Sequence, residues 1–84
     1  MFQKEIFCFR IKKIRRVSKE SQVDLAEALK LSQSQVSAME TGRQTTTMEN
    51  LYKICKHYNV SADYLIGLTD EPRPLDGNQK EGSA

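Results

Sequence analysis

The sequence predicts an all-α domain built from short helices. Apolar residues recur at helical spacing along most of the chain, and no segment of four or more residues alternates as a strand would. Residues 22–42, QVDLAEALKLSQSQVSAMETG, predict two short helices joined by a tight turn. A pair of helices in this relation is how many small proteins place one helix in the major groove of DNA.

The first expected helix carries Phe7, Ile11 and Ile14 on one face and ends near Val17 or Ser18. An apolar stripe then predicts a second helix, which contains Leu25, Ala26 and Leu29. Ser21 precedes this stripe and Asp24 follows three residues later, which is the pattern of a helix cap.

The third expected helix opens at Ser32, because Gln35 stands three residues further on and can reach back to the serine amide. Val36 and Met39 form its apolar stripe, and Gly42 stands where a left-handed residue ends a helix. Only residues 30 and 31 separate the second helix from the third, so the connection is sharp.

Thr46 or Thr47 can cap a fourth helix, whose apolar face recurs at helical spacing through Leu51, Ile54, Cys55 and Tyr58. Ser61 can cap a short fifth helix. Three side chains of that region are expected to turn inward: Tyr64, Leu65 and Leu68. Prolines and glycines lie among charges in the remaining residues. We therefore expect a folded domain over residues 1–68 and a flexible, disordered, acidic tail over residues 69–84.

Composition favours a folded chain, because 38% of the 84 residues are hydrophobic and 29% are charged. No apolar run approaches the roughly 20 residues that cross a bilayer, and the amino terminus lacks the order of a signal peptide. These features predict a cytoplasmic protein. The net charge is +2, but residues 1–20 hold seven basic and two acidic side chains. That excess permits phosphate binding, and it equally suits the solvated face of a helix.

Rotating the third helix by 100° per residue places Val36, Met39 and Glu40 on its inner side. Small or hydrogen-bonding side chains fall on the opposite side: Ser34, Ser37, Ala38 and Thr41. Gln33 lies in the first turn, where its long amide can reach past the helix end. A glutamine amide pairs with adenine N6 and N7, and serine suits several base edges. An ordinary surface helix with a polar outside remains the alternative interpretation.

Three stretches together resemble one known family. They are RIKKIR at 10–15, SQVDLAEALKLSQSQVSAMETGR at 21–43 and NLYKICKHYNVSADYLIGLTD at 50–70. The chain resembles the phage-repressor and Cro type of helix-turn-helix domain, also called the XRE family. This resemblance implies a compact bundle of five short helices of the phage-repressor type, with the helix-turn-helix at helices two and three.

The resemblance also implies roles for individual residues. Base-reading positions fall on Gln33, Ser34 and Ala38, with Ser37 and Thr41 as neighbours. Gln22 matches a residue that contacts a phosphate and braces the first residue of the recognition helix, and Arg43 matches a second phosphate contact. Arg10 is expected to be a further phosphate contact. Arg15 and Glu40 match a structural ion pair, which suits an inward-facing carboxylate because an unpaired buried charge is costly.

The sequence departs from the family pattern in two informative places. Lys30 stands where the turn residue is usually glycine, and a positive φ there costs lysine about 1 kcal/mol. The recognition helix carries no Arg or Lys from 33 to 41, so readout should depend on adenine, thymine methyl groups and DNA shape.

We therefore predict a sequence-specific regulator of double-stranded DNA, acting as a homodimeric repressor on a pseudo-palindromic operator. Its two recognition helices should lie about 34 Å apart. The candidate dimer residues are Tyr64, Ile66 and Leu68. The alternative is an antitoxin-like or adapter protein that uses the same bundle to hold a protein partner. No phosphate loop, paired-carboxylate motif or metal-ligand cluster is recognisable, so we expect no catalytic or metal site, no cofactor and no small-molecule ligand.

Overall fold

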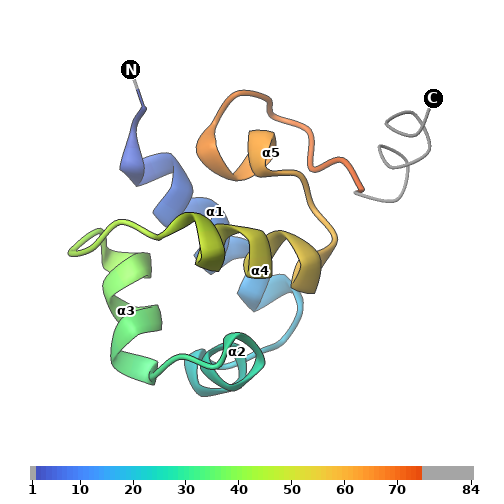
Figure 1. Ribbon diagram of the computed structural model, residues 1–84. Coiled ribbons are helices and arrows are strands. Elements are labelled where there is room, and N and C mark those ends of the chain that lie inside the picture. The colour runs from blue at the N-terminus through green and yellow to red at the C-terminus, as the bar shows by residue number, and fades with distance from the viewer. Residues whose placement is uncertain (1, 75–84) are drawn as a thin grey trace.

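Five α-helices form the part of the chain that the computed structural model describes, residues 2–74 (Figure 1). They are α1 (Lys4–Val17), α2 (Gln22–Leu29), α3 (Gln33–Thr41), α4 (Met48–Tyr58) and α5 (Ala62–Ile66). The prediction of an all-α, five-helix domain is confirmed. None of the described helices is long and apolar enough to cross a membrane.

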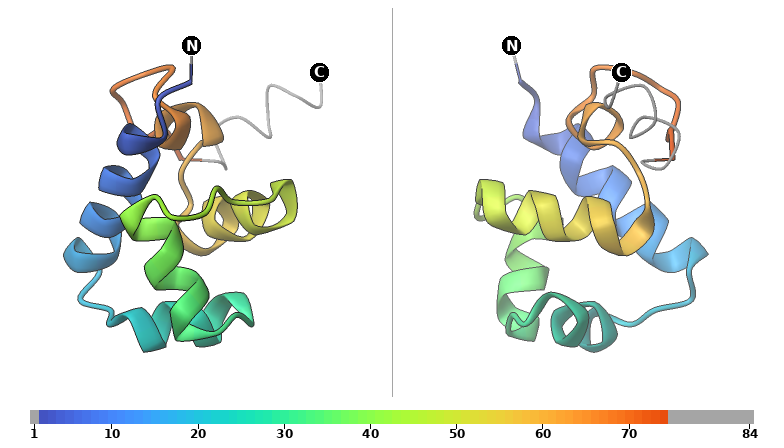
Figure 2. Two further views of the ribbon diagram at one scale, coloured as in Figure 1. Left: turned by 90° about the vertical axis from the view of Figure 1, so that its left-hand side faces the viewer. Right: turned by 45° about the vertical axis from the view of Figure 1, so that its right-hand side comes forward.

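The two helices α2 and α3 pack against each other at one end of the molecule, the lower end in Figures 1 and 2. Helix α1 contacts both α3 and α5, while α4 contacts α2 and α5. The start of α1 and the whole of α5 therefore lie at the opposite end. The long helices α1 and α4 thus support the α2–α3 pair, because α1 packs against α3 and α4 packs against α2.

Reciprocal hydrogen bonds fix the start of both helices of that pair. The N–H of Asp24 donates to Ser21 Oγ at 3.0 Å, and the N–H of Ser21 donates to Asp24 Oδ2 at 2.9 Å. At the next helix the N–H of Gln35 donates to Ser32 Oγ at 3.1 Å, and the N–H of Ser32 donates to Gln35 Oε1 at 2.8 Å. Both predicted capping boxes are confirmed. They determine which residue opens each helix.

The sharp turn between α2 and α3 depends on a left-handed residue. Lys30 has φ 60° and ψ 44°, so lysine does occupy the conformation that glycine adopts more easily. The N–H of Leu31 then donates to Ala26 O at 2.8 Å, which closes the end of α2. Gly42 ends α3 with φ 82°, as predicted. Lys19 also has a positive φ, 61°, which the sequence did not indicate.

The core draws side chains from every helix. The largest fully buried ones are Ile11, Leu25, Leu29, Ile54, Leu65 and Val36. Tyr64 is only 8% exposed and belongs to this core, as predicted for its inward side. Leu68 was expected to turn inward, and this is wrong: it is 74% exposed, because Gly67 ends α5 in a left-handed conformation before it.

Arg10 ties α5 and the residues just after it to α1. Its guanidinium donates to the carbonyls of Tyr64 and Thr69, the latter at 2.7 Å, and to Asp70 Oδ1 at 2.9 Å. It also lies over the Tyr64 ring, 4.3 Å from its centroid. Thr69 and Asp70, the first two residues of the expected tail, are thus in contact with α1. The part of the expected tail from 75 to 84 lies outside the described residues.

Candidate nucleic-acid interface

The exposed side of α3 is polar and small, as the sequence predicted, with one exception. Gln33, Ser34 and Thr41 are exposed, and Ser37 is half-buried. Ala38 was expected on the outer face, but it is 6% exposed. Its methyl group projects little, and the chain folds back over this turn, where the N–H of Gln44 donates to Ala38 O at 3.3 Å. Ala38 therefore offers far less surface than the other four positions.

A buried ion pair lies directly behind this face. Arg15 Nε donates to Glu40 Oε2 at 2.6 Å, and Arg15 Nη2 donates to Glu40 Oε1 at 3.0 Å. The Glu40 side chain is fully buried and that of Arg15 is 10% exposed. The third guanidinium nitrogen, Nη1, donates to Glu20 O at 2.7 Å. The hydrogen bond to Glu40 raises the pKa of Arg15 above its ordinary value. Helix α1 is thereby joined to α3 through two charges.

Two glutamines continue this line of hydrogen bonds to the surface. Gln22 Nε2 donates to Glu40 Oε1 at 3.1 Å, and Gln33 Nε2 donates to Gln22 Oε1 at 3.2 Å. Gln22 and Gln33 are the first residues of α2 and α3, so the capping boxes and the turn at Lys30 bring them together. The amide of Gln33 is therefore held at the exposed edge of the pair.

Thr41 and Arg43 are coupled at the other end of α3. Thr41 Oγ1 donates to Ser37 O at 2.9 Å and accepts a hydrogen bond from Arg43 Nε at 3.2 Å. The hydroxyl proton of Thr41 is thus used within the helix, which leaves it as an acceptor. Arg43 is exposed, and the left-handed Gly42 directs the chain away from α3 just before it.

The sequence of α2, α3 and the helices that support them matches a known protein family. Residues 11–65 match the sequence model of the helix-turn-helix family. The chain belongs to the helix-turn-helix family. It is 30% identical over 69 residues to YobD, an uncharacterized HTH-type transcriptional regulator of Bacillus subtilis (strain 168). The match covers 82% of this chain and 62% of that protein, so the chain spans less than two thirds of its relative's length.

The predicted membership of the phage-repressor and Cro type is thereby confirmed. Proteins of this helix-turn-helix family are DNA-binding transcriptional regulators and not enzymes. Among residues 2–74 the structure contains no group of three or more His, Cys, Asp and Glu side chains arranged to hold a metal ion. Cys55 lies in the core, and burial raises the pKa of its thiol, which disfavours the nucleophilic thiolate.

Arg10, which the sequence analysis expects to contact a phosphate, has its hydrogen bonds within the protein. Its guanidinium is engaged by the end of α5 and by Asp70, and its side chain is 15% exposed. These partners lie at the end of the molecule opposite α2 and α3. Arg10 joins α1 to α5 and to the residues that follow it. The positive charge next to α3 is that of Arg43.

The sequence also missed a cluster beside the start of α2. His57 Nε2 lies 2.8 Å from Glu20 Oε2, and Tyr58 OH donates to Glu20 Oε1 at 2.6 Å. Burial and the neighbouring Glu20 carboxylate raise the pKa of Tyr58 far above its usual range. No sequence signal marks this cluster, because its members stand 37 and 38 residues apart and meet only in the folded chain.

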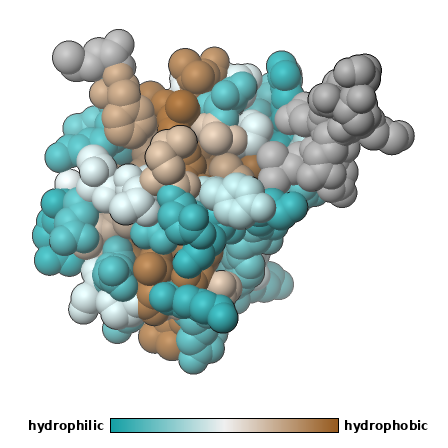
Figure 3. All heavy atoms as spheres, viewed as in Figure 1, coloured by the Kyte–Doolittle hydropathy of each residue, from teal (hydrophilic) through white to brown (hydrophobic). Residues whose placement is uncertain are grey.

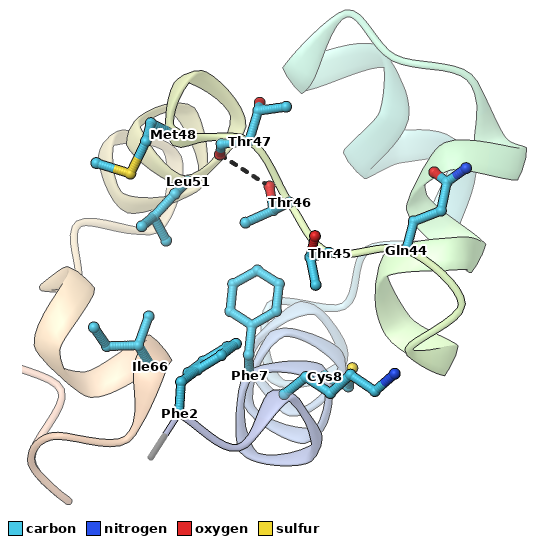
Figure 4. A pocket seen from close by; sticks show the side chains of 11 residues that line it. Phe2, Phe7, Cys8, Gln44, Thr45, Thr46, Thr47, Met48, Leu51 and Ile66 are labelled. Carbon is cyan, nitrogen blue, oxygen red and sulfur yellow. Dashed lines mark hydrogen bonds between the residues drawn. The ribbon is translucent and has the colours of Figure 1, made fainter.

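Apolar side chains are exposed near the start of α1 and the end of α5, in the upper part of the view in Figure 3. Figure 4 shows a hollow of about 250 Å³ between the start of α1, the loop before α4 and the end of α5. The side chains of Phe2, Phe7, Leu51 and Ile66 point toward it. A neighbouring hollow shares Phe2 and Ile66 and adds Leu68. Two of the three dimer candidates, Ile66 and Leu68, thus border this surface. The third, Tyr64, is wrong as a surface contact because it is buried.

Proposed function

We propose that this protein is a sequence-specific, double-stranded DNA-binding transcriptional regulator, and that it acts as a homodimeric repressor on a pseudo-palindromic operator. The observation that carries the proposal is the surface of α3, where an exposed Gln33 is held in place by Gln22 while its outer edge stays free. An amide that is held in place in this way loses less conformational freedom when it binds a base edge.

Base readout is assigned to Gln33 and Ser34 in the first turn of α3, with Ser37, Thr41 and the recessed Ala38 as secondary contacts. A glutamine amide offers one donor and one acceptor to adenine, and serine serves several base edges. Since α3 carries no Arg or Lys, bidentate contacts to guanine are absent from it. The operator should therefore be rich in A·T pairs where α3 reads it, with DNA shape supplying further discrimination.

Phosphate contacts are assigned to Gln22 and Arg43, which flank α3 at its two ends. The amide of Gln22 keeps a second N–H for a phosphate oxygen after donating to Glu40. Arg43 is exposed and supplies a full positive charge just beyond the helix. Contacts of this kind fix the orientation of the domain on the duplex without carrying sequence information.

A second copy of the chain is assigned to the apolar surface between the start of α1, the loop before α4 and the end of α5. Of the described residues, Lys4 is the only charged one that lines either hollow. In a contact about a twofold axis each residue near the axis faces its own copy, so a charged surface would repel itself and a neutral one does not. Met48 and Leu68 are 81% and 74% exposed at its edge, so association would cover them.

Dimerisation can be tested without DNA. Met48→Glu should lower the fraction of dimer in sedimentation velocity experiments. Phe9→Glu is the control, because Phe9 is 65% exposed and lines neither of these two hollows. If Met48→Glu and the control leave the dimer equally intact, the second copy binds elsewhere.

Repression would follow from occupancy: a bound dimer excludes RNA polymerase from an overlapping promoter. A protein of this kind acts on DNA in the bacterial cytoplasm. One observation favours the second candidate, an adapter that holds a protein partner, namely the neutral α3 surface without Arg or Lys. A selection of bound duplexes from a randomised pool separates the two, because an adapter enriches no sequence.

Two variants then test the assigned contacts on the selected duplex. Gln33→Ala should lose about 1–3 kcal/mol on the cognate site and relax preference at one base pair. Arg43→Ala should weaken binding to all sequences alike and reduce the slope of log K against log salt by about 0.9. Arg73→Ala, which removes an exposed positive charge beyond α5 and outside both hollows, is the control. A Gln33→Ala protein that retains every preference excludes Gln33 as a base reader.

A further inference from the structure

The hydrogen bonds that connect Glu40 with Gln22 and Gln22 with Gln33 have a fixed order of donors and acceptors. It begins at the Glu40 carboxylate, whose side chain is fully buried. A carboxylate carries no N–H and can only accept hydrogen bonds. Arg15 donates to both of its oxygens, which compensates its buried charge.

This acceptor character determines how the two amides behind it are turned. The end of the Gln22 amide that lies 3.1 Å from Glu40 must be its nitrogen. The oxygen of Gln22 then faces Gln33, so the end of the Gln33 amide that lies 3.2 Å away must also be nitrogen. The alternative orientation of either glutamine would place two acceptors or two donors against each other, which is unfavourable.

We infer that Glu40 is a positioning residue for base recognition, which sets through Gln22 the orientation in which Gln33 presents its amide to DNA. The inference deepens the proposed function and rests on it. Gln33 retains a free Oε1 on the side away from α2 and one free N–H on the side toward α2. That pattern matches adenine placed with N7 nearer α2 and N6 farther from it.

Other base pairs do not fit the fixed amide. Guanine presents two acceptors, O6 and N7, in the major groove, so the Gln33 oxygen would face a guanine oxygen. Reversing the A·T pair moves the adenine edge to the other strand. A freely rotating amide could turn to suit several of these arrangements. The buried carboxylate therefore supplies specificity although it touches no base.

The decisive variant is Glu40→Gln. An amide at position 40 can offer its own N–H to Gln22, so the orientation of Gln22 and Gln33 is no longer imposed. We expect the preference for adenine at the base pair assigned by Gln33→Ala to fall about tenfold, with preferences at other positions unchanged. Glu27→Gln is the matched control, because it makes the same change of charge at an exposed position of α2.

A second variant breaks the same hydrogen bonds at Gln22, outside the buried ion pair. Gln22→Met interrupts the line of hydrogen bonds but leaves the Arg15–Glu40 pair in place, so it serves even where Glu40→Gln unfolds. It should lower the same adenine preference by a similar factor, in addition to a uniform loss from the missing phosphate contact. In the free protein, the side-chain NH₂ signals of Gln33 should shift in Gln22→Met and stay in place in Glu27→Gln.

A merely structural role for Glu40 predicts a different outcome, namely an equal loss of affinity for every sequence. If the folded variants retain the wild-type ratio at the adenine position, the inference is overturned while the proposed function stands. If the wild-type protein enriches no sequence from a random pool, the proposed function fails instead. The two failures are therefore distinguishable.

Discussion

Removing one partner of the Arg15–Glu40 pair should cost nearly as much stability as removing both. Arg15→Met leaves the fully buried carboxylate with a single donor, Gln22 Nε2, and leaves Glu20 O without its donor. Breaking a buried pair in this way typically costs 3–5 kcal/mol, and we expect about 4 kcal/mol here. That is a large share of the roughly 5–15 kcal/mol that stabilises a domain.

Glu40→Met should cost less, about 3 kcal/mol, because the guanidinium that remains keeps its bond to Glu20 O and is 10% exposed to water. The double variant leaves no buried charge, and two flexible methionines can fill the space. We expect it to lose no more than about 4 kcal/mol, so the coupling between the two sites is about 3 kcal/mol.

The measurement is urea unfolding followed by circular dichroism, performed near 15 °C, where domains of this size are close to maximum stability. Lys13→Met provides a control on the exposed side of α1 and should change the unfolding free energy by about 0.5 kcal/mol or less. Strictly additive losses in the two single variants would refute the reasoning, since they would mean that neither charge depends on the other.

Three further outcomes are expected. Lys30→Gly should stabilise the domain by about 0.5–1 kcal/mol, because it relieves the left-handed strain at the turn, and thermal unfolding should show a higher Tm. Arg10→Met should accelerate amide exchange around Thr69 and leave DNA affinity unchanged, whereas a loss of affinity would restore a phosphate role. Above pH 10 the unfolded chain loses the Tyr58 proton more readily than the folded one, so stability should fall there. Titration of the Tyr58→Phe variant should give a shallower slope, and an equal slope would contradict the raised pKa.

The features that the sequence predicted well are those encoded within a few residues. Each capping box needs only a serine and a side chain three positions later, as at Ser21 and Ser32. The left-handed residue at Lys30 follows from the family resemblance, in which this position is usually glycine. The inward face of α3, with Glu40 on it, follows from the helical period alone.

The features that the sequence did not indicate depend on contacts between distant parts of the chain. Arg10 meets carbonyls that stand 54 and 59 residues away, and no local pattern indicates this. The sequence alone allows Tyr64 to face either a partner or the core. It lies in the core because α5 packs against α1. Ala38 differs from the prediction for another reason: a helical wheel gives an angle, while exposure also depends on side-chain length and on how the following loop runs.

The candidate interface combines these two kinds of information. The local signals fix where α2 and α3 begin, and therefore how close Gln22 lies to Gln33. Only the long-range pair of Arg15 and Glu40 fixes how those two amides are turned. Changes to the local signals, such as Lys30→Gly, should thus alter stability and leave the preferred base unchanged. Changes to the buried pair should alter both, because the same carboxylate that joins α1 to α3 also orients the amide that would read the base.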